Sequence, residues 1–234
     1  MKKLTTIILC ASVSAASAAT VASDSFTYPD GALVPNGGWQ NHSGTAGTLL
    51  VLGGGVQISQ DSGLEDANLG FGATYTTGTV SASFEISVAA SGGITGTDFE
   101  YFTHFMESGS SFIGRTDVVA PTGAGDFTLG IASFSSTAEA TLPTDFSFGT
   151  IVPVTISFNL DTGLASLTAG GNTVSSTTVA LGETVNQLGL RQSNSSSDEL
   201  ISFDNLVLDY EPIPEPSSAL LGSMALLGLL RRKR

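Results

Sequence analysis

Cysteine and charge are both scarce in this 234-residue chain. The single cysteine, Cys10, lies in an apolar leader, so a chain that loses its leader has no thiol and no disulfide. Only 12% of the residues are charged, whereas glycine, serine, threonine and β-branched residues are abundant. This balance favours many short strands joined by tight turns over helices. A length of 234 residues favours one large domain with a sizeable core.

Basic residues are almost missing from the interior of the sequence. Two lysines open the chain, four basic residues close it, and only Arg115 and Arg191 lie between, while residues 20–211 hold 20 of the 21 acidic residues. Such an acidic surface repels phosphate backbones and anionic lipid. Nucleic acid is therefore excluded as a partner, and neutral polysaccharide, divalent cations or basic proteins remain.

The first 18 residues have the three parts of a secretory signal peptide. Lys2 and Lys3 precede an apolar stretch around Leu4 to Val13, and small residues end the segment at Ala16-Ser17-Ala18. A short core helix is the alternative, but it does not explain the small residues at the exit. We therefore predict a signal helix over residues 1–18, entry into the secretion machinery and cleavage after Ala18.

The C-terminal residues 212–234 form a proline-rich stalk, an apolar segment and a basic end. Prolines in Pro212-Ile213-Pro214-Glu215-Pro216 remove backbone donors and stiffen the chain. Ser217 to Leu230 holds no charge and spans roughly 21 Å as a helix, against about 30 Å of bilayer hydrocarbon. Extended back through Pro212, the segment reaches the length of a membrane helix, with the terminal cations in the cytoplasm.

A Pro-Glu-Pro motif followed by an apolar segment and a terminal basic cluster resembles the PEP-CTERM sorting signal. The residues that carry the resemblance are Pro214, Glu215 and Pro216, with Arg231, Arg232, Lys233 and Arg234. The resemblance implies that an exosortase-type membrane enzyme recognises the motif, while the helix and basic tail hold the chain in the membrane. It also implies processing near the motif and a final place at the cell surface or in the extracellular matrix. A plain tail anchor is the alternative.

Residues 19–211 show the two-residue periodicity of strands with one buried face. Alternation is cleanest from Val80 to Val88 and recurs at Phe127 to Ile131 and Val154 to Leu160. Near the end of this region the apolar residues change parity, which predicts a β-bulge at Asp204-Asn205.

Turn motifs such as Asp161-Thr162-Gly163 and Gly170-Gly171-Asn172 separate the short strands. Short strands separated by turns at regular intervals predict an all-β, two-sheet antiparallel sandwich. The meander from Val154 to Val174 and the closing strand Ile201 to Leu206 resemble the concanavalin A or laminin-G jelly roll.

Trp39 and His42 are the candidate ligand-binding residues. Trp39 stands next to Gln40 and Asn41, and an exposed aromatic ring beside amide groups can stack a sugar ring and bond its hydroxyls. The alternative is that the lone tryptophan anchors the core, as tryptophan more often does in a sandwich.

Calcium is the candidate metal, since carboxylate oxygens are its usual ligands. Asp61, Glu65 and Asp66 form one candidate cluster, and Asp204 with Asn205 forms another. Ordinary surface acids and a bulge explain both groups equally well, and no cofactor is firmly implied.

No catalytic set is evident, so we expect a protein that is not an enzyme. Laminarinase-like glycosidases carry Glu-x-Asp-x-x-Glu on one strand, and the nearest stretch here keeps only Glu85. His42 and His104 have no nucleophile motif beside them. The leading hypothesis is an exported, exosortase-processed surface or matrix protein that binds extracellular polysaccharide. A purely structural or adhesive matrix component and a divergent glycoside hydrolase or lyase are the alternatives.

Overall fold

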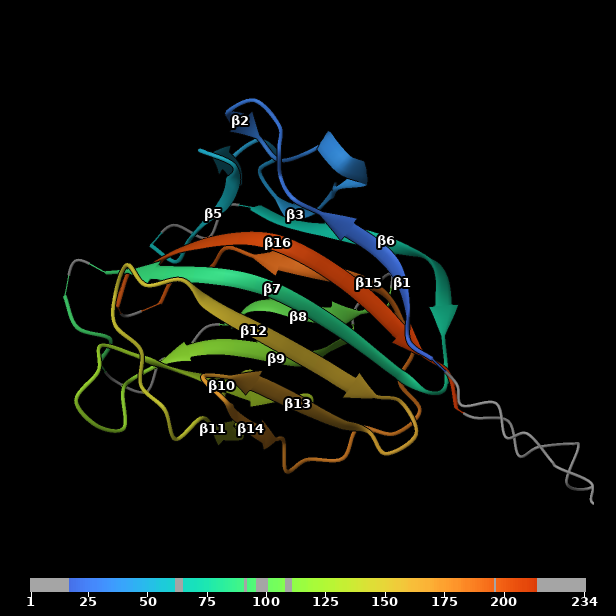
Figure 1. Cartoon of the computed structure of the whole chain (residues 1–234). Coiled ribbons are helices and arrows are strands. Elements are labelled where there is room, and N and C mark those ends of the chain that lie inside the picture. Colours follow the sequence, from blue (N-terminus) through green and yellow to red (C-terminus); the bar gives the residue numbers. More distant parts are fainter. Residues whose placement is uncertain are drawn as a thin grey trace, which may run out of the picture.

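The computed structural model describes residues 17–61, 65–90, 92–95, 101–107, 111–195 and 197–213. In these ranges the chain forms strands β1 to β16 and a single 3-10 turn, η1 (Asn36–Gly38). The strands pair antiparallel in two sheets that lie face to face, with β7, β12 and β16 in front of β8 and β9 in Figure 1. The predicted all-β, two-sheet antiparallel sandwich is confirmed.

Nine strands make the first sheet. In spatial order they are β14 (Asn172–Ser175), β13 (Leu164–Ala169), β12 (Val152–Asn159), β7 (Thr79–Ala89), β16 (Leu200–Glu211), β5 (Gly55–Ser59), β4 (Leu50–Leu52) and β2 (Gly31–Ala32). The ninth strand, β1 (Ala19–Asp24), pairs with the second half of β16, while β5 pairs with its first half.

Seven strands make the second sheet. Their order is β11 (Ala140–Thr141), β10 (Thr128–Ala132), β9 (Phe112–Val119), β8 (Tyr101–Met106), β15 (Val185–Arg191), β6 (Glu65–Tyr75) and β3 (Gln40–Gly44). Neighbours in this order are often distant in sequence, so the sheet assembles from non-local pairings.

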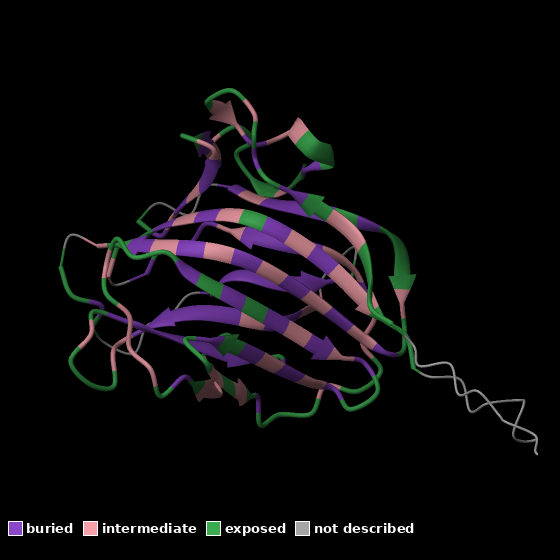
Figure 2. Ribbon diagram, in the orientation of Figure 1, coloured by how far each residue is buried: buried purple, intermediate pink, exposed green. Residues whose placement is uncertain are grey.

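The core fills the space between the two sheets. Along β7 the even-numbered residues from Val80 to Val88 are buried, and the residues between them are partly exposed, as the banding in Figure 2 shows. The same alternation holds for β12. Burying each large aliphatic or aromatic side chain contributes about 1.5–3 kcal/mol to the free energy of folding. Hydrophobic burial between the sheets is therefore the main source of stability.

The predicted β-bulge in β16 is confirmed. The register between β16 and β7 shifts between Asp204 and Val207, and Asn205 has a φ of 55°. Because of this extra residue, Phe203, Leu206 and Leu208 all reach the core.

The Asp-Thr-Gly turn between β12 and β13 is also where the sequence places it. Gly163 has a φ of 69°, and a Cβ there would lie 2.6 Å from the backbone of Ala180. Both the conformation and the close approach require glycine.

The ends of the sandwich lie side by side, because Ala19 of β1 pairs with Tyr210 of β16. The predicted signal helix (residues 1–18) and C-terminal membrane segment (residues 212–234) lie outside the described residues except for residues 17–18 and 212–213. Within the described part of the chain, no helix has the length and apolar character needed to cross a membrane. Both terminal assignments stay predictions.

Candidate functional site

The outer face of the seven-stranded sheet, which points away from the core, carries the most unusual set of side chains in the described structure. Leu188 and Leu190 of β15 enter the core, so Gly189 and Arg191 between and beyond them face outward. Strand pairing then aligns outward residues in rows. One row runs through Arg191, Asp66 and Ser43, and the next through His104, Gly189, Asn68 and Gln40, while Tyr101 pairs with Asp117 of β9.

Irregular pairing of β8 explains why two large side chains share this face. The register between β8 and β9 shifts on both sides of Thr103, so the usual alternation is interrupted. Phe102 and Phe105 belong to the core, whereas Tyr101 and His104 do not. The bulged strand thus delivers an aromatic ring and an imidazole to the outer face.

Arg115 of β9 and Arg191 of β15 converge on the ring of Tyr101 from the two strands that flank β8. Their guanidinium carbons lie 4.7 Å and 4.4 Å from the ring centroid. Arg115 also lies 5.8 Å from the Phe112 ring centroid, and its Nε donates a hydrogen bond to the Phe112 carbonyl at 3.0 Å. These are the only two basic residues between Lys3 and Arg231. The fold therefore gathers the positive charge of a strongly acidic region at one aromatic ring.

His104 lies beside this pair and is only 2% exposed. Its ring stands against Gly189, where a Cβ would lie 2.6 Å from Nε2. Neither ring nitrogen has a hydrogen-bond partner among the described residues. Burial, and then the charges of Arg115, Arg191 and His42, lowers the pKa of His104 to about 3. The imidazole is therefore neutral at physiological pH and can both donate and accept a hydrogen bond.

Two carboxylates balance part of the positive charge. Asp66 accepts a hydrogen bond from Ser43 Oγ at 2.8 Å. Burial raises the pKa of Asp66, while the Ser43 hydrogen bond and the charge of Arg191 oppose that rise. Asp117, fully buried, is the ladder neighbour of Tyr101. The site thus combines both signs of charge with aromatic rings.

A pocket of about 450 Å³ opens on the same face, at β6 and β15. It is lined by Gly70, Gly72, Ala73, Thr74, Asn186 and Gln187. Asn68 Nδ2 donates to Gln187 Oε1 at 2.6 Å, and Asn68 Oδ1 is buried without a hydrogen-bond partner among the described residues. Because Asn68 is the ladder neighbour of Gly189, this amide pair connects the pocket to the His104 row.

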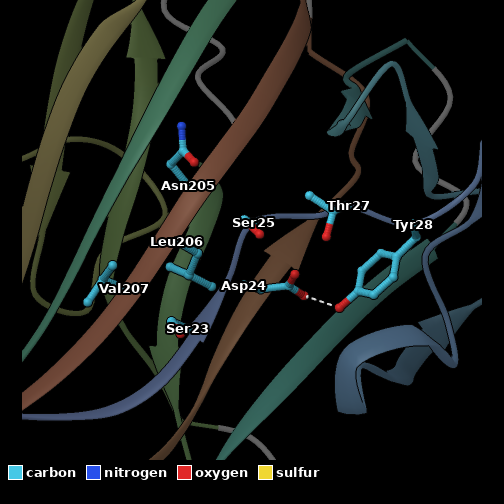
Figure 3. A pocket seen from close by; sticks show the side chains of 8 residues that line it. All are labelled: Ser23, Asp24, Ser25, Thr27, Tyr28, Asn205, Leu206 and Val207. Atoms are coloured by element: carbon cyan, nitrogen blue, oxygen red, sulfur yellow. Dashed lines mark hydrogen bonds between the residues drawn. The ribbon is translucent and has the colours of Figure 1, made fainter.

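A second pocket, of about 390 Å³, lies between β1 and the bulge of β16 and is lined by Ser23, Asp24, Ser25, Thr27, Tyr28, Asn205, Leu206 and Val207 (Figure 3). Its carboxylate, Asp24, accepts hydrogen bonds from the Phe26 backbone N–H, the Tyr28 hydroxyl and Trp39 Nε1, each at 2.8 Å. Burial and the bond to Asp24 raise the pKa of Tyr28 to about 12. Asp24 thus serves to fix the local structure.

The two candidate ligand residues are placed apart. Trp39 is 1% exposed and belongs to the core, with its N–H bonded to Asp24, so it offers no platform for a sugar. This corrects the sugar-stacking interpretation in favour of the core anchor. His42 is half-buried, and its ring lies 5.7 Å from that of Phe112, edge to face. It therefore belongs to the outer-face group.

The candidate calcium ligands do not gather. Glu65 is buried and accepts hydrogen bonds from the backbone N–H groups of Thr48 and Leu49 at 2.7 and 2.8 Å. Asp66, the next residue, faces the outer surface, and Asp61 pairs with Ser59. No group of three or more His, Cys, Asp or Glu side chains suited to a metal occurs among the described residues.

Asp204 and Asn205 lie on the outer face of the nine-stranded sheet with Glu85. Asp204 is the ladder neighbour of Glu85, and Asn205 Nδ2 donates to Glu85 Oε2 at 2.9 Å. The bulge thus gives Glu85 a carboxylate neighbour that the sequence pattern did not show. Pro214 to Pro216 and Arg231 to Arg234 lie outside the described residues.

Sequence reasoning missed Tyr101, Arg115 and Arg191 as site residues. The signal that could have found them was the isolation of two arginines in an acidic chain. Their convergence on one ring, however, depends on the strand order β9-β8-β15.

No protein-family model and no curated protein matches the chain. Solved structures do. The carbohydrate recognition domain of Emp47p superposes with a TM-score of 0.54 at 10% identity, over 84% of this chain and 97% of that domain. Peanut lectin, solved with a nine-residue peptide, gives 0.52 at 12% identity, over 83% and 97%.

A sialidase gives a TM-score of 0.55 at 12% identity, over 86% of this chain but only 19% of the sialidase. At such low identities the likeness establishes the fold alone. That fold is the concanavalin A-like jelly roll of the legume-type lectins, as the strand pattern predicted.

Proposed function

We propose that the chain is an exported, non-enzymatic protein of the cell surface or extracellular matrix that binds polysaccharide through the outer face of its seven-stranded sheet. The observation that carries this proposal is a group of accessible side chains at β9: the half-buried Arg115 lies 5.8 Å and 5.9 Å from the ring centroids of Phe112 and the exposed Phe134, and His42 lies edge to face on Phe112. Aromatic rings flanked by hydrogen-bonding groups are the usual means of holding a sugar, since rings pack against its apolar faces and polar groups bond its hydroxyls.

The fold supports this choice of ligand class. Two of the similar structures are described as a lectin and a carbohydrate recognition domain. The adjoining 450 Å³ pocket, with its glycine floor and amide groups, extends the polar surface along the same face. A polymer lying across several strands can therefore contact both the pocket and the arginine group.

Export and anchoring remain part of the proposal through the two terminal segments. The first strand begins at Ala19 and the last ends at Glu211, and both ends leave the sandwich at one corner. Membrane tethering through the proline-rich stalk and its processing by an exosortase-type enzyme are compatible with that exit. Mass spectrometry of the protein as produced by its host cells should find an N-terminus near Ala19 and a C-terminus near Pro214 to Pro216. Recovery of Arg234 in secreted material would contradict processing.

The binding experiment uses the full-length chain, immobilised and exposed to a panel of neutral and acidic polysaccharides with and without calcium. Retention of at least one polysaccharide supports the proposal. A panel without retention would refute it and favour the structural or adhesive alternative, which light scattering would then show as self-association.

A divergent glycoside hydrolase or lyase is a second candidate because Glu85 and Asp204 are ladder neighbours. Paired carboxylates are what sugar hydrolysis requires. Release of new reducing ends or unsaturated products, abolished by Glu85→Gln, would establish this alternative. We propose binding instead because the aromatic and cationic groups lie on the opposite sheet.

A further inference from the structure

A row of exposed and half-buried side chains crosses the outer face of the seven-stranded sheet. The guanidinium carbon of Arg115 lies 5.9 Å from the ring centroid of Phe134 and 5.8 Å from that of Phe112. The Phe112 ring in turn lies 5.7 Å from the ring of His42, edge to face. These four residues are named the aromatic row. It begins after β10, includes β9 and ends on β3, so it spans the positions of β8, β15 and β6 in the strand order.

Phe134 is the most accessible member of the aromatic row. It is 49% exposed and is the one aromatic residue among the large exposed hydrophobic residues of the described ranges. Ala132, two residues earlier, is the ladder neighbour of Arg115. Ser133, which follows Ala132, is buried and turns inward, with its hydroxyl oxygen 2.6 Å from that of Ser176. Phe134 therefore projects from the same face as Arg115, with much of its ring open to solvent.

Arg115 holds the rings of the row in place. Its Nε donates a hydrogen bond to the Phe112 carbonyl at 3.0 Å, and its guanidinium carbon lies 4.7 Å from the centroid of the buried Tyr101 ring. A guanidinium group is attracted to the faces of aromatic rings. Phe112 also packs edge to face on the buried His104, at 4.7 Å. A ligand thus meets rings that are already positioned, which lowers the ordering cost of binding, and it needs no donor from Arg115.

A pyranose ring is the ligand unit that this surface fits. Its C–H groups form an apolar face that can pack flat on an aromatic ring, while its hydroxyls remain at the rim. Stacking on Phe134 buries apolar surface of both partners and requires no charge. The residues that follow, Ser135, Ser136 and Thr137, are exposed and uncharged, and their side chains can bond sugar hydroxyls.

The charge of the surrounding chain selects for a neutral polymer. Residues 20–211 carry two basic residues against 20 acidic ones, so a polyanion is repelled at long range. A neutral polysaccharide meets no such barrier. Because the aromatic row runs across several strands, it can contact several consecutive sugar units of one chain.

We infer that the aromatic row binds a neutral polysaccharide over several consecutive sugar units, with one pyranose ring stacked on Phe134 and further units over Phe112 and His42. This inference rests on the proposed function and specifies its ligand class and its main contact.

The first test compares polymers that differ in charge and length. Full-length chain is immobilised in buffer containing EDTA, and dextran, laminarin and galactan are each offered beside their carboxymethylated forms. We expect at least one neutral polymer to bind about tenfold or more tightly than its carboxymethylated form, with an affinity that changes less than about twofold between low and high salt. Oligosaccharides of the same linkage should gain about tenfold or more in affinity from monomer to hexamer.

Variants of Phe134 then locate the contact. Phe134→Ala and Phe134→Leu should each weaken binding of the retained polymer about tenfold or more, because neither keeps a flat ring, whereas Phe134→Trp should keep the affinity within about threefold. Ile151→Ala is the matched control, since Ile151 is 69% exposed and directly precedes β12 of the other sheet. It should leave the affinity within about twofold. Thermal melting confirms that each variant is folded, and the comparison of polymers on the parent chain needs no variant.

Each result decides a separate point. Equal or tighter binding of the carboxymethylated forms, a monomer that binds as tightly as the hexamer, or a folded Phe134→Ala chain that binds like its parent overturns the inference while the proposed function stands. Failure to retain any polymer, neutral or acidic, overturns the proposed function as well.

Discussion

The outer faces of the two sheets differ in how they satisfy their polar groups. On the nine-stranded sheet, small hydroxyl side chains pair across strands: Ser83 with Thr155 at 3.0 Å, and Thr168 with Thr173 at 2.8 Å. On the seven-stranded sheet, Tyr101 and His104 are buried, and Asn68 and His104 keep buried polar atoms without hydrogen-bond partners among the described residues. On the nine-stranded sheet these hydroxyl groups therefore satisfy one another's hydrogen-bonding capacity.

This difference indicates that one sheet mainly stabilises the fold, whereas the other carries the binding face. A surface of paired serine and threonine side chains stabilises strands and remains hydrated, so it needs no partner. The outer face of the seven-stranded sheet has a bulged strand, clustered cations and buried polar groups without hydrogen-bond partners among the described residues. Such departures from regular packing and hydrogen bonding are expected at functional sites. The sheet that is simplest to predict is therefore the supporting one.

Acid sensitivity should give the largest effect that separates the faces. His104 has a folded-state pKa of about 3 against an unfolded value near 6.5, so below pH 6.5 the unfolded chain binds a proton that the folded chain refuses. The free energy of unfolding should thus fall as the pH is lowered from about 6.5 toward 3. The positive charges of Arg115, Arg191 and His42 also lower the pKa of His104, in addition to its burial.

His104→Phe should remove that slope while leaving stability at pH 7 unchanged or slightly raised, because it replaces an unsatisfied buried group with an apolar ring. Urea unfolding of parent and variant at pH 7, 5 and 4 measures the difference. Identical pH slopes would show that His104 is not the group responsible.

Gly189→Ala should have the next largest effect. The new Cβ would lie 2.6 Å from the His104 ring, and this overpacking should cost about 1–3 kcal/mol in unfolding free energy. Gly70→Ala is the matched control on the same face, since its Cβ would meet nothing within 4 Å. If both variants lost the same stability in denaturant titrations, the imidazole would not be as tightly seated as described.

Tyr101→Leu should remove the ring on which both arginines converge. A double-mutant cycle with Arg191→Gln should show a coupling energy of about 0.5–2 kcal/mol in unfolding free energy, the range for a partly buried cation–π pair. Additive effects in chemical denaturation would mean that the close approach is energetically unimportant.

Ser83→Ala on the nine-stranded sheet should have the smallest effect. Loss of its bond to Thr155 should cost only about 0.2–1 kcal/mol, and polysaccharide binding should not change. A marked loss of binding in a pull-down with this variant would reverse the roles assigned to the two faces.

Local pattern was enough to predict the supporting sheet. Alternation along Val80 to Val88, the Asp-Thr-Gly turn and the bulge at Asp204-Asn205 all depend on residues close in sequence, and the structure shows each of them. Single-residue assignments were less secure, as the burial of Trp39 demonstrates. A strand pattern does not tell which loop residue will enter the core.

The site itself was beyond local pattern. Tyr101 and His104 share a face only because register shifts interrupt β8, and Arg115 meets Arg191 only because β8 separates their strands. Bulge positions in an all-buried strand and the order of strands distant in sequence are decided by tertiary packing. Composition alone marked the two arginines as exceptional, without showing that they meet.

Hydrogen–deuterium exchange with and without a bound polysaccharide tests the central claim most directly. The account predicts slower exchange in β8, β9 and β15 on binding, with little change in β7 and β12. Protection confined to β7, β12 or β16, or no protection in either sheet, would contradict the assignment of the seven-stranded sheet as the binding face.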